Sequence, residues 1–106
     1  MIDIGVGYYR RTSTRNVFDA TWYTTRLDRQ EIGSGIVKGD TSNGFPGNYI
    51  VTYYDSDGSE AGTFDLNIKK TGTIYELSWS KDGERLYIGV GIETSDGMAI
   101  SYREAE

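Results

Sequence analysis

The stretch that decides the fold runs from residue 62 to residue 104 and reads GTFDLNIKKTGTIYELSWSKDGERLYIGVGIETSDGMAISYRE. Apolar and polar residues alternate along it, which is the period of a strand with one buried face. Turn signals interrupt the alternation at Thr71-Gly72, Asp82-Gly83 and Ser95-Asp96-Gly97. Asp-Gly between two alternating runs is a strong hairpin signal, because a type I′ turn needs positive φ at both central residues. The stretch therefore predicts a series of antiparallel hairpins.

These turns also predict the register of the strands. Short loops at the three turns place apolar side chains opposite one another on a single face. The expected pairs are Phe64 with Trp79, Leu66 with Leu77, Ile68 with Tyr75, Trp79 with Leu86, Leu77 with Ile88, Tyr75 with Val90, Ile92 with Ile100, and Val90 with Tyr102. One face of the hairpin series is therefore expected to be buried and the other exposed to solvent.

The chain before this stretch continues the same pattern. Further strands are expected at residues 2–10, 17–27, 31–39 and 48–55. Asp57-Gly58 predicts the turn into the stretch quoted above. Residues 39–48 (GDTSNGFPGN) hold the only proline and form the longest irregular segment, whose aromatic residue, Phe45, is expected to plug one end of the fold. No helical period interrupts the strands.

Sequential antiparallel strands that each have one apolar face must bury those faces inside the fold. An up-and-down meander that closes on itself needs no crossing connection and removes both sheet edges. We therefore predict an all-β fold, an antiparallel up-and-down meander of about eight strands closed into a small barrel, with residues 1–106 as a single domain. The interior of such a barrel is filled by side chains or holds one small ligand.

Glycines alternate with aliphatic residues in three of the expected strands. If the aliphatic residues point inward, the glycines lie on the convex outer face, where they let a strand coil sharply. The aliphatic residues expected inside are Ile4, Val6, Ile32, Ile36, Ile88 and Val90. The glycines expected outside are Gly5, Gly7, Gly33, Gly35, Gly89 and Gly91.

The composition excludes several classes of chemistry. The 106 residues contain no cysteine and no histidine, which removes disulfides, thiolate nucleophiles and the commonest general base and metal ligand. We therefore expect no metal site and no cofactor. A net charge of −5 argues against nucleic acid as a partner. No apolar run approaches the roughly 20 residues of a membrane helix, and the strand-like start predicts a cytoplasmic protein that does not bind a membrane.

In shape the expected barrel resembles the small bacterial up-and-down β-barrels of the avidin- and lipocalin-like (calycin) type. The resemblance covers the whole chain and consists of strand count, order and spacing, and the Gly-x-Trp motif of lipocalins is missing near the first strand. It implies a ligand held in the open end of the barrel.

The residues expected inside the barrel include many aromatic side chains with a polar tip. Such side chains suit a pocket that is mostly apolar and has a few hydrogen-bond donors. The sequence contains 9 tyrosines and only 3 phenylalanines, whereas a purely structural core would use Leu and Phe. The candidate ligand-binding residues are Tyr8, Trp22, Tyr53, Trp79 and Tyr102. The alternative is that these rings only fill the barrel.

No residue is assigned as catalytic. The carboxylates nearest to the aromatic strands are those of Asp19, Asp65 and Glu76, and the alternation puts all three out of phase with the interior. The first hypothesis is therefore a non-enzymatic module that binds a small hydrophobic or aromatic ligand at one barrel end. The second is a cofactor-free cyclase that uses the same lining to fold a flexible substrate. The third is a protein–protein interaction module with a filled core, acting through its outer face or as a homodimer.

Overall fold

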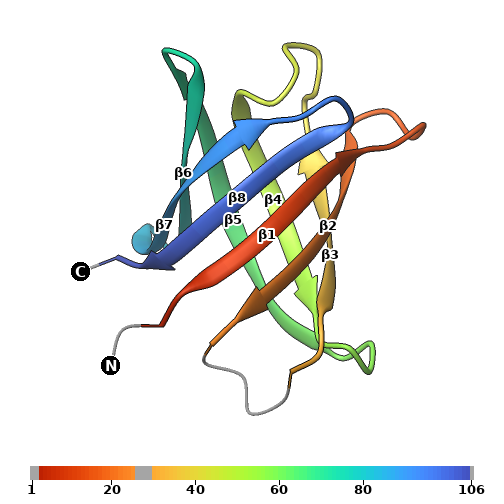
Figure 1. Cartoon of the computed structure of the whole chain (residues 1–106), viewed down its shortest axis with the longest axis vertical. Coiled ribbons are helices and arrows are strands. Elements are labelled where there is room, and N and C mark those ends of the chain that lie inside the picture. The colour runs from red at the N-terminus through yellow and green to blue at the C-terminus, as the bar shows by residue number, and fades with distance from the viewer. Residues whose placement is uncertain (1–2, 26–29, 106) are drawn as a thin grey trace.

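The structure is a computed structural model that describes residues 3–25 and 30–105. These residues form the strands β1 (Gly5–Arg11), β2 (Val17–Thr24), β3 (Gly33–Gly39), β4 (Gly47–Tyr54), β5 (Glu60–Thr71), β6 (Ile74–Lys81), β7 (Glu84–Glu93) and β8 (Gly97–Glu104). Each strand pairs antiparallel with the next along the chain, and β1 also pairs with β8, so that the sheet closes on itself (Figure 1). The predicted all-β, up-and-down, closed barrel is confirmed.

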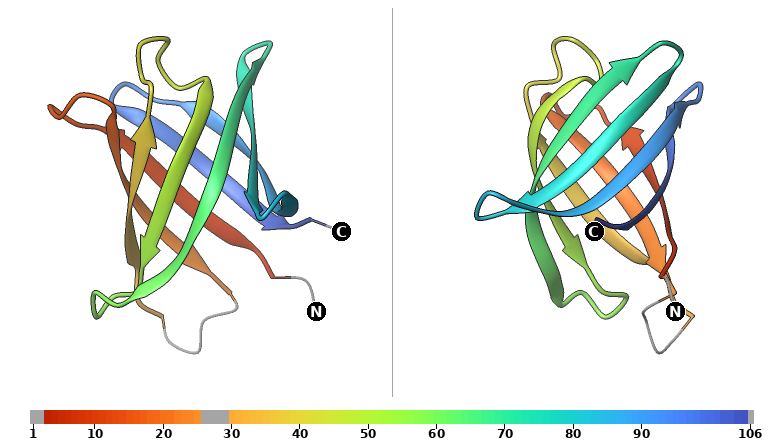
Figure 2. Two further views of the ribbon diagram at one scale, coloured as in Figure 1. Left: turned by 180° about the vertical axis from the view of Figure 1, so that it is seen from behind. Right: turned by 90° about the vertical axis from the view of Figure 1, so that its left-hand side faces the viewer.

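The strands run obliquely around one continuous wall, and their connections lie at two ends (Figure 2). One end, which we call the closed end, carries the connections β1–β2, β3–β4, β5–β6 and β7–β8. The other, the open end, carries the β4–β5 and β6–β7 turns, the start of β1 and the end of β8. No helix that could cross a membrane occurs in the described parts of the chain.

Two hairpin turns show how turn chemistry sets the register. Asp82 and Gly83 have φ angles of 53° and 81°, so both central residues adopt the positive φ predicted for a type I′ turn. At the β5–β6 turn, Gly72 has a φ of 61° and suits the first central position of a type II′ turn. Thr71 therefore pairs with Ile74. The observed register of this hairpin differs from the predicted one by two residues, so each side chain stays on its predicted face. The observed pairs include Leu66 with Trp79 and Ile68 with Leu77.

A β-bulge near the start of β7 reverses the predicted orientation of that strand. Ser80 pairs with Arg85, but the next pair is Trp79 with Tyr87, so Leu86 is an extra residue on β7. A slip of one residue moves every following side chain to the opposite face. The predicted pairs Trp79–Leu86, Leu77–Ile88, Tyr75–Val90, Ile92–Ile100 and Val90–Tyr102 are therefore wrong, and Tyr87, Gly89 and Gly91 take the inward positions.

The glycines of β1, β3 and β7 face the interior, which contradicts the prediction from the sequence. A Cβ atom on Gly5 would lie 2.1 Å from the ring of Tyr102, and one on Gly33 would lie 2.4 Å from the indole nitrogen of Trp22. The glycines are inside because the aromatic rings need the space that a side chain would take. The inward glycines are Gly5, Gly7, Gly33, Gly35, Gly89 and Gly91. Their aliphatic neighbours Ile4, Val6, Ile32, Ile36, Ile88 and Val90 point outward instead.

Phe45 plugs the closed end, as predicted. Its side chain is 1% exposed, and its ring centroid lies 4.8 Å from that of Phe18 and 5.9 Å from that of Tyr75. The hydroxyl of Tyr49 donates a hydrogen bond of 2.8 Å to the Phe45 carbonyl oxygen and so fixes the loop that carries the plug. The guanidinium carbon of Arg11 lies 4.6 Å from the Phe45 ring centroid and covers it with a positive charge.

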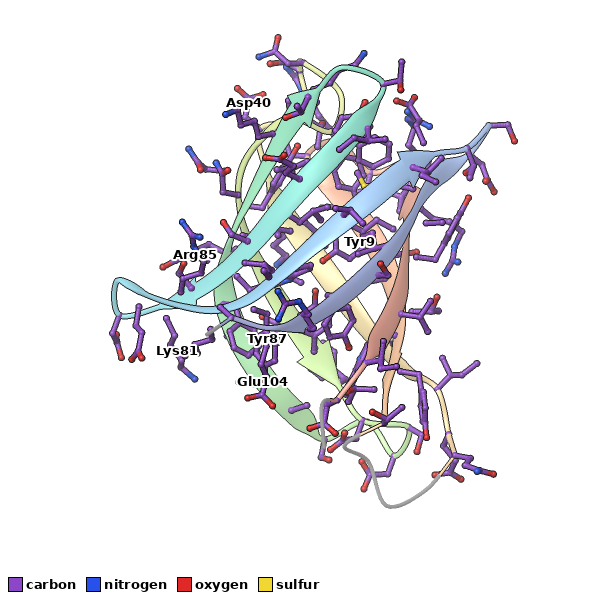
Figure 3. The ribbon with its side chains drawn as sticks, turned by 60° about the vertical axis from the view of Figure 1, so that its left-hand side comes forward. Tyr9, Asp40, Lys81, Arg85, Tyr87 and Glu104 are labelled. Carbon is purple, nitrogen blue, oxygen red and sulfur yellow. The ribbon has the colours of Figure 1, made fainter. Side chains whose placement is uncertain are left out.

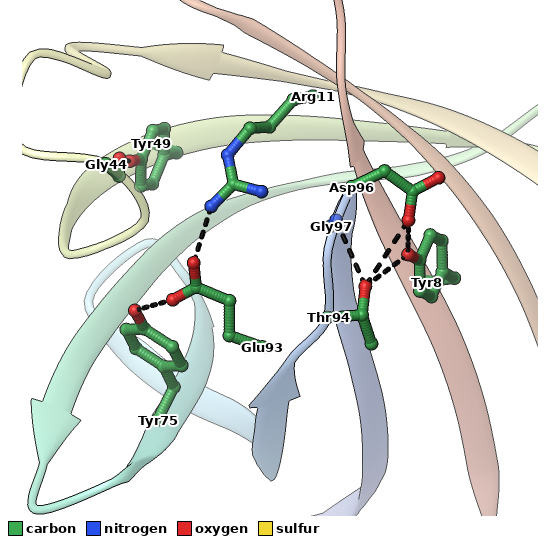
Figure 4. Close-up of polar contacts among 9 residues, drawn as sticks. All are labelled: Tyr8, Arg11, Gly44, Tyr49, Tyr75, Glu93, Thr94, Asp96 and Gly97. Atoms are coloured by element: carbon green, nitrogen blue, oxygen red, sulfur yellow. Dashed lines mark hydrogen bonds and ion pairs between the residues drawn. The ribbon is translucent and has the colours of Figure 1, made fainter.

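Arg11 also belongs to a short polar chain over this end. Its Nη2 atom lies 2.7 Å from Oε2 of Glu93, and the hydroxyl of Tyr75 donates a hydrogen bond of 2.6 Å to Oε1 of the same carboxylate (Figure 4). The hydrogen bond from Tyr75 and then the one from Arg11 hold the pKa of Glu93 below its usual range. The closed end is therefore sealed by an aromatic plug with an ion pair beside it.

Candidate functional site

A cavity of about 420 Å³ lies at the open end of the barrel. Its volume is in the range of pockets that hold small organic ligands. Aromatic side chains from six strands line it, namely Trp22, Tyr53, Phe64, Trp79, Tyr87 and Tyr102. Figure 3 shows Tyr87 and Glu104, which both line the cavity, at one end of the molecule and Asp40 at the other. The cavity and the Phe45 plug therefore occupy opposite ends of the barrel.

The six rings form a continuous structure that we call the aromatic belt. Neighbouring ring centroids lie 5.7 Å apart for Trp22 and Tyr53, 6.1 Å for Tyr53 and Phe64, 5.8 Å for Phe64 and Tyr87, 6.2 Å for Tyr87 and Tyr102, and 5.5 Å for Tyr102 and Trp79. The indole N–H of Trp79 donates a hydrogen bond of 2.8 Å to the hydroxyl oxygen of Tyr53 and closes the belt. Ring pairs at these separations stabilise each other by about 0.5–1.5 kcal/mol beyond their burial.

Hydrogen bonds to the barrel wall hold two rings of the belt. Tyr102 crosses β1 where Gly5 leaves room, and its hydroxyl donates a hydrogen bond of 3.3 Å to the Tyr23 carbonyl oxygen on β2. The indole N–H of Trp22 donates one of 2.8 Å to the Ser34 carbonyl oxygen on β3. A ring held both by packing and by a hydrogen bond loses little freedom when a ligand binds, so the belt is a preorganised surface.

Below the belt, two tyrosine hydroxyls and one indole N–H meet. The hydroxyls of Tyr9 and Tyr53 lie 2.5 Å apart, and the N–H of Trp79 is donated to Tyr53. The three side chains bring three donor hydrogens, and two hydrogen bonds join them. One hydroxyl hydrogen is therefore left without an acceptor among the described residues. When Tyr9 donates to Tyr53, this hydrogen belongs to Tyr53, which lines the cavity.

Both hydroxyls remain protonated over a wide range of pH. Burial is the main cause that raises the pKa of Tyr9 and of Tyr53 well above the ordinary value of 10.0, and the neighbouring phenol raises the pKa of Tyr53 further. A buried phenol that keeps its proton is a hydrogen-bond donor. The cluster therefore presents a neutral donor to the base of the cavity.

Four of the five residues predicted to bind a ligand lie together around this cavity. They are Trp22, Tyr53, Trp79 and Tyr102, which come from four different strands. The alternation of β2, β4, β6 and β8 gave their inward orientation correctly, because these strands do not alternate glycine with aliphatic residues as β1, β3 and β7 do. Their role in binding remains a prediction.

The fifth residue, Tyr8, lies on the outer face of β1, so the prediction that it points inward is wrong. Its hydroxyl contacts the hydroxyl of Thr94 and donates to the Asp96 carboxylate at the closed end (Figure 4). The hydrogen bond from Tyr8 is the main cause that lowers the pKa of Asp96. The inward aromatic residue of β1 is its neighbour Tyr9, which is 2% exposed.

Two rings of the belt were not among the predicted binding residues. Phe64 was expected inside, but its place at the open end depends on the length of β5 and on the turn that precedes this strand. The predicted register put Leu86 and Ile88 inside, so Tyr87 was expected outside. The bulge at Leu86, which reverses this, has no clear mark in the sequence. The available signal was the run Tyr87-x-Gly89-x-Gly91, in which one ring and two glycines share a face.

Charged side chains also line the cavity. Asp3, Asp55, Glu60 and Glu104 contribute carboxylates, whereas Arg103 contributes one guanidinium group. The ammonium group of Lys81 lies 5.6 Å from the ring centroid of Phe64 and so adds a second positive charge at this end (Figure 3). Among the residues that the structure describes, carboxylates therefore outnumber cationic groups here by four to two.

Neither a metal cluster nor a known relative identifies the site. Within residues 3–25 and 30–105, no three acidic side chains are arranged to hold a metal ion. Comparison of the chain with protein-family models, curated proteins and solved structures gave no match. The eight-stranded, closed, up-and-down barrel is compatible with a calycin-like shape. Function must therefore be argued from the geometry of the cavity.

Proposed function

We propose that the protein binds a small, largely apolar or aromatic molecule in the cavity at its open end. The observation that supports this most strongly is the aromatic belt, which surrounds about 420 Å³ of space while Phe45 fills the opposite end. A core that served only stability would close that space, because unfilled volume costs stability. The ligand would thus lie in the open end, as in avidin- and lipocalin-like barrels.

The polar groups of the cavity suggest how the ligand is oriented. The apolar part of the ligand would stack on the rings, and a carbonyl, ether or ring nitrogen would accept the spare hydrogen of the Tyr9–Tyr53 pair. Such a hydrogen bond fixes orientation more than it adds affinity. The ligand therefore has one acceptor at its inner end.

A matched pair of variants tests whether the cavity is the binding site. Thr24 lines the cavity, whereas Thr21 lies on the opposite face of the same strand. Titration with N-phenyl-1-naphthylamine, a neutral dye that fluoresces in apolar surroundings, is expected to saturate at one dye per chain. Thr24→Phe should abolish this signal because the new ring fills the opening, and Thr21→Phe should leave it unchanged. Equal binding by both variants, or no binding by the natural chain, would refute the proposal.

A second measurement, made with the natural chain and the Thr24→Phe variant, separates a binding module from a cofactor-free cyclase. A cyclase would use the belt to fold a flexible substrate, and its product would differ from the molecule supplied. We expect bound small molecules to be recovered unchanged after long incubation, as shown by mass spectrometry and chromatographic retention. Isomerised product that forms with the natural chain and not with Thr24→Phe would favour the cyclase.

We infer self-association as a second candidate function, supported by the aliphatic side chains on the outer face of β1 and β7. Val6 and Val90 are 56% and 52% exposed, and both flank Ser101 of the intervening strand β8. Glu76 and Arg85, of opposite charge, line the same surface hollow as Val90. A two-fold pairing of two copies would bury the aliphatic residues and bring these charges together.

Sedimentation equilibrium tests this second candidate. The natural chain is expected to form a dimer, and Val90→Lys is expected to shift it to monomer because it buries a charge in the interface. Ile50→Lys, at a residue that is 50% exposed on β4, is the control and should stay dimeric. A natural chain that remains monomeric at high concentration would rule the dimer out.

A further inference from the structure

We propose that the ligand of the open-end cavity is an organic cation, with its positive charge held between the aromatic belt and the carboxylates that line the cavity. This inference rests on the proposed function, because it adds a charge to the ligand class already argued. Arylalkyl amines and quaternary ammonium compounds have this chemistry. Three observations on different side chains support it.

The first observation is the distribution of charge around the cavity. Asp55 and Glu60 bracket the turn between β4 and β5, and Asp3 and Glu104 approach from the two ends of the chain. Arg103 is the one cationic side chain in the lining within residues 3–25 and 30–105. A cleft with low-dielectric walls and an excess of one charge concentrates ligands of the opposite charge. The lining therefore favours a cation over an anion.

The second observation is that cationic groups already lie on aromatic rings at both ends of this barrel. The ammonium group of Lys81 is 5.6 Å from the Phe64 ring centroid, within the distance at which a ring attracts a cation. At the closed end the guanidinium carbon of Arg11 is 4.6 Å from the Phe45 ring centroid. The negative faces of the belt rings offer the same attraction to a ligand cation, and aromatic cages bind quaternary ammonium groups in this way.

The third observation concerns the inner end of the cavity. The Tyr9–Tyr53 pair is neutral, because burial raises the pKa of both phenols far above neutrality. From the described part of the chain, the inner end thus receives a hydrogen-bond donor and no ionised group, whereas the carboxylates come from the ends of β4, β5, β8 and the segment before β1. A ligand would place its aromatic part and acceptor inward and its positive group toward the carboxylates.

A set of ligands of nearly equal shape tests the charge separately from the binding. Phenyltrimethylammonium and tert-butylbenzene differ by one nitrogen for carbon replacement, and benzenesulfonate is an anionic counterpart. In calorimetric titration at low salt, the cation is expected to bind at least about tenfold more tightly than the neutral molecule. Its advantage should shrink as sodium chloride is raised, because salt screens the carboxylates. Benzenesulfonate should not bind measurably.

Two charge-neutralising variants complete the test. Glu60→Gln, in the cavity lining, should weaken the binding of phenyltrimethylammonium several-fold and leave the affinity for tert-butylbenzene unchanged. Asp65→Asn, on the outer face of β5, is the matched control and should change the affinity for neither compound. If tert-butylbenzene bound as tightly as the cation, the charge proposal would be overturned while the proposed function stood. If neither molecule nor the neutral naphthylamine dye bound, the proposed function itself would fail.

Discussion

The hydroxyl groups of Tyr9 on β1 and Tyr53 on β4 lie 2.5 Å apart across the interior of the barrel. These two strands are not neighbours in the sheet, so this contact joins opposite parts of the wall. It lies at the base of the cavity, where Trp79 donates a further hydrogen bond to Tyr53. The residues that shape the candidate site therefore also brace the barrel.

Replacing Tyr53 by Phe should lower stability by about 1–3 kcal/mol, because the Trp79 N–H and the Tyr9 hydroxyl lose a buried partner. The midpoint of urea unfolding measures this loss. Tyr54→Phe removes a hydroxyl from the outer face of the same strand and should change stability by less than about 0.5 kcal/mol. Equal midpoints for the two variants would contradict the importance of the Tyr53 hydroxyl.

Replacing Gly5 by Ala should be much more harmful than the same change at Gly7. The new Cβ at residue 5 would lie 2.1 Å from the Tyr102 ring, which must move, whereas the nearest atom to a Cβ at residue 7 is the Thr21 carbonyl oxygen at 3.3 Å. We expect overpacking at residue 5 to cost about 1–3 kcal/mol in thermal or urea unfolding. It should also weaken ligand binding, since Tyr102 belongs to the belt. A Gly5→Ala protein as stable as Gly7→Ala would refute this account of the inward glycines.

Stability should decline at alkaline pH. Burial raises the pKa of Tyr9 and Tyr53 above the ordinary value of 10.0, and burial together with the charge of Asp40 raises the pKa of Tyr49 to about 12. Above pH 10 the unfolded chain therefore releases protons that the folded chain retains, so the free energy of unfolding falls as pH rises. Below about pH 10 the stabilising contribution of these buried phenols to the free energy of unfolding is fully present.

Urea midpoints measured across that range should fall, and absorbance at 295 nm should show these phenols ionising only when the barrel unfolds. The Tyr9→Phe variant should have a shallower decline than Tyr54→Phe. A midpoint that did not change between about pH 9 and pH 11 would mean that the buried phenols titrate normally.

Replacing Phe45 by Ala should cost about 3–5 kcal/mol, because the side chain is buried against Phe18 and Tyr75. Asn43→Ala, at an exposed position of the same loop, should be nearly neutral. Ligand affinity at the open end should stay within about twofold for both variants, because the plug lies at the opposite end of the barrel. A large loss of affinity in a folded Phe45→Ala protein would show that the two ends are coupled.

The sequence predicted the barrel because local signals are sufficient to define consecutive hairpins. Strict alternation placed Trp22, Tyr53 and Trp79 on the inner face, and the type I′ turn at Asp82-Gly83 formed as expected. These predictions needed only the period of a strand and the φ preferences of a turn. They brought most of the candidate site together without knowledge of the tertiary structure.

The strands in which glycine alternates with an aliphatic residue could not be oriented by the same rule. Hydrophobicity alone points Val6 inward and Gly5 outward, whereas the structure does the reverse. The deciding factor is the volume of rings on other strands, such as Tyr102 over Gly5, and that volume is known only after the barrel has closed. Tyr8 and Tyr87 were misplaced for this reason and because of the bulge at Leu86.

The extra residue at Leu86 also decides which side chain of β7 reaches the cavity. Had β7 kept its phase, Ile88 and Val90 would have pointed inward in place of Gly89 and Gly91, which leave room for the side chains of other strands. Tyr87 would then have left the cavity lining. One inserted residue thus gives the rings of neighbouring strands their space and turns branched aliphatic residues toward solvent. Deleting Leu86 would therefore bring Ile88 and Val90 against Trp79, Tyr102 and Met98 and would break the aromatic belt at Tyr87.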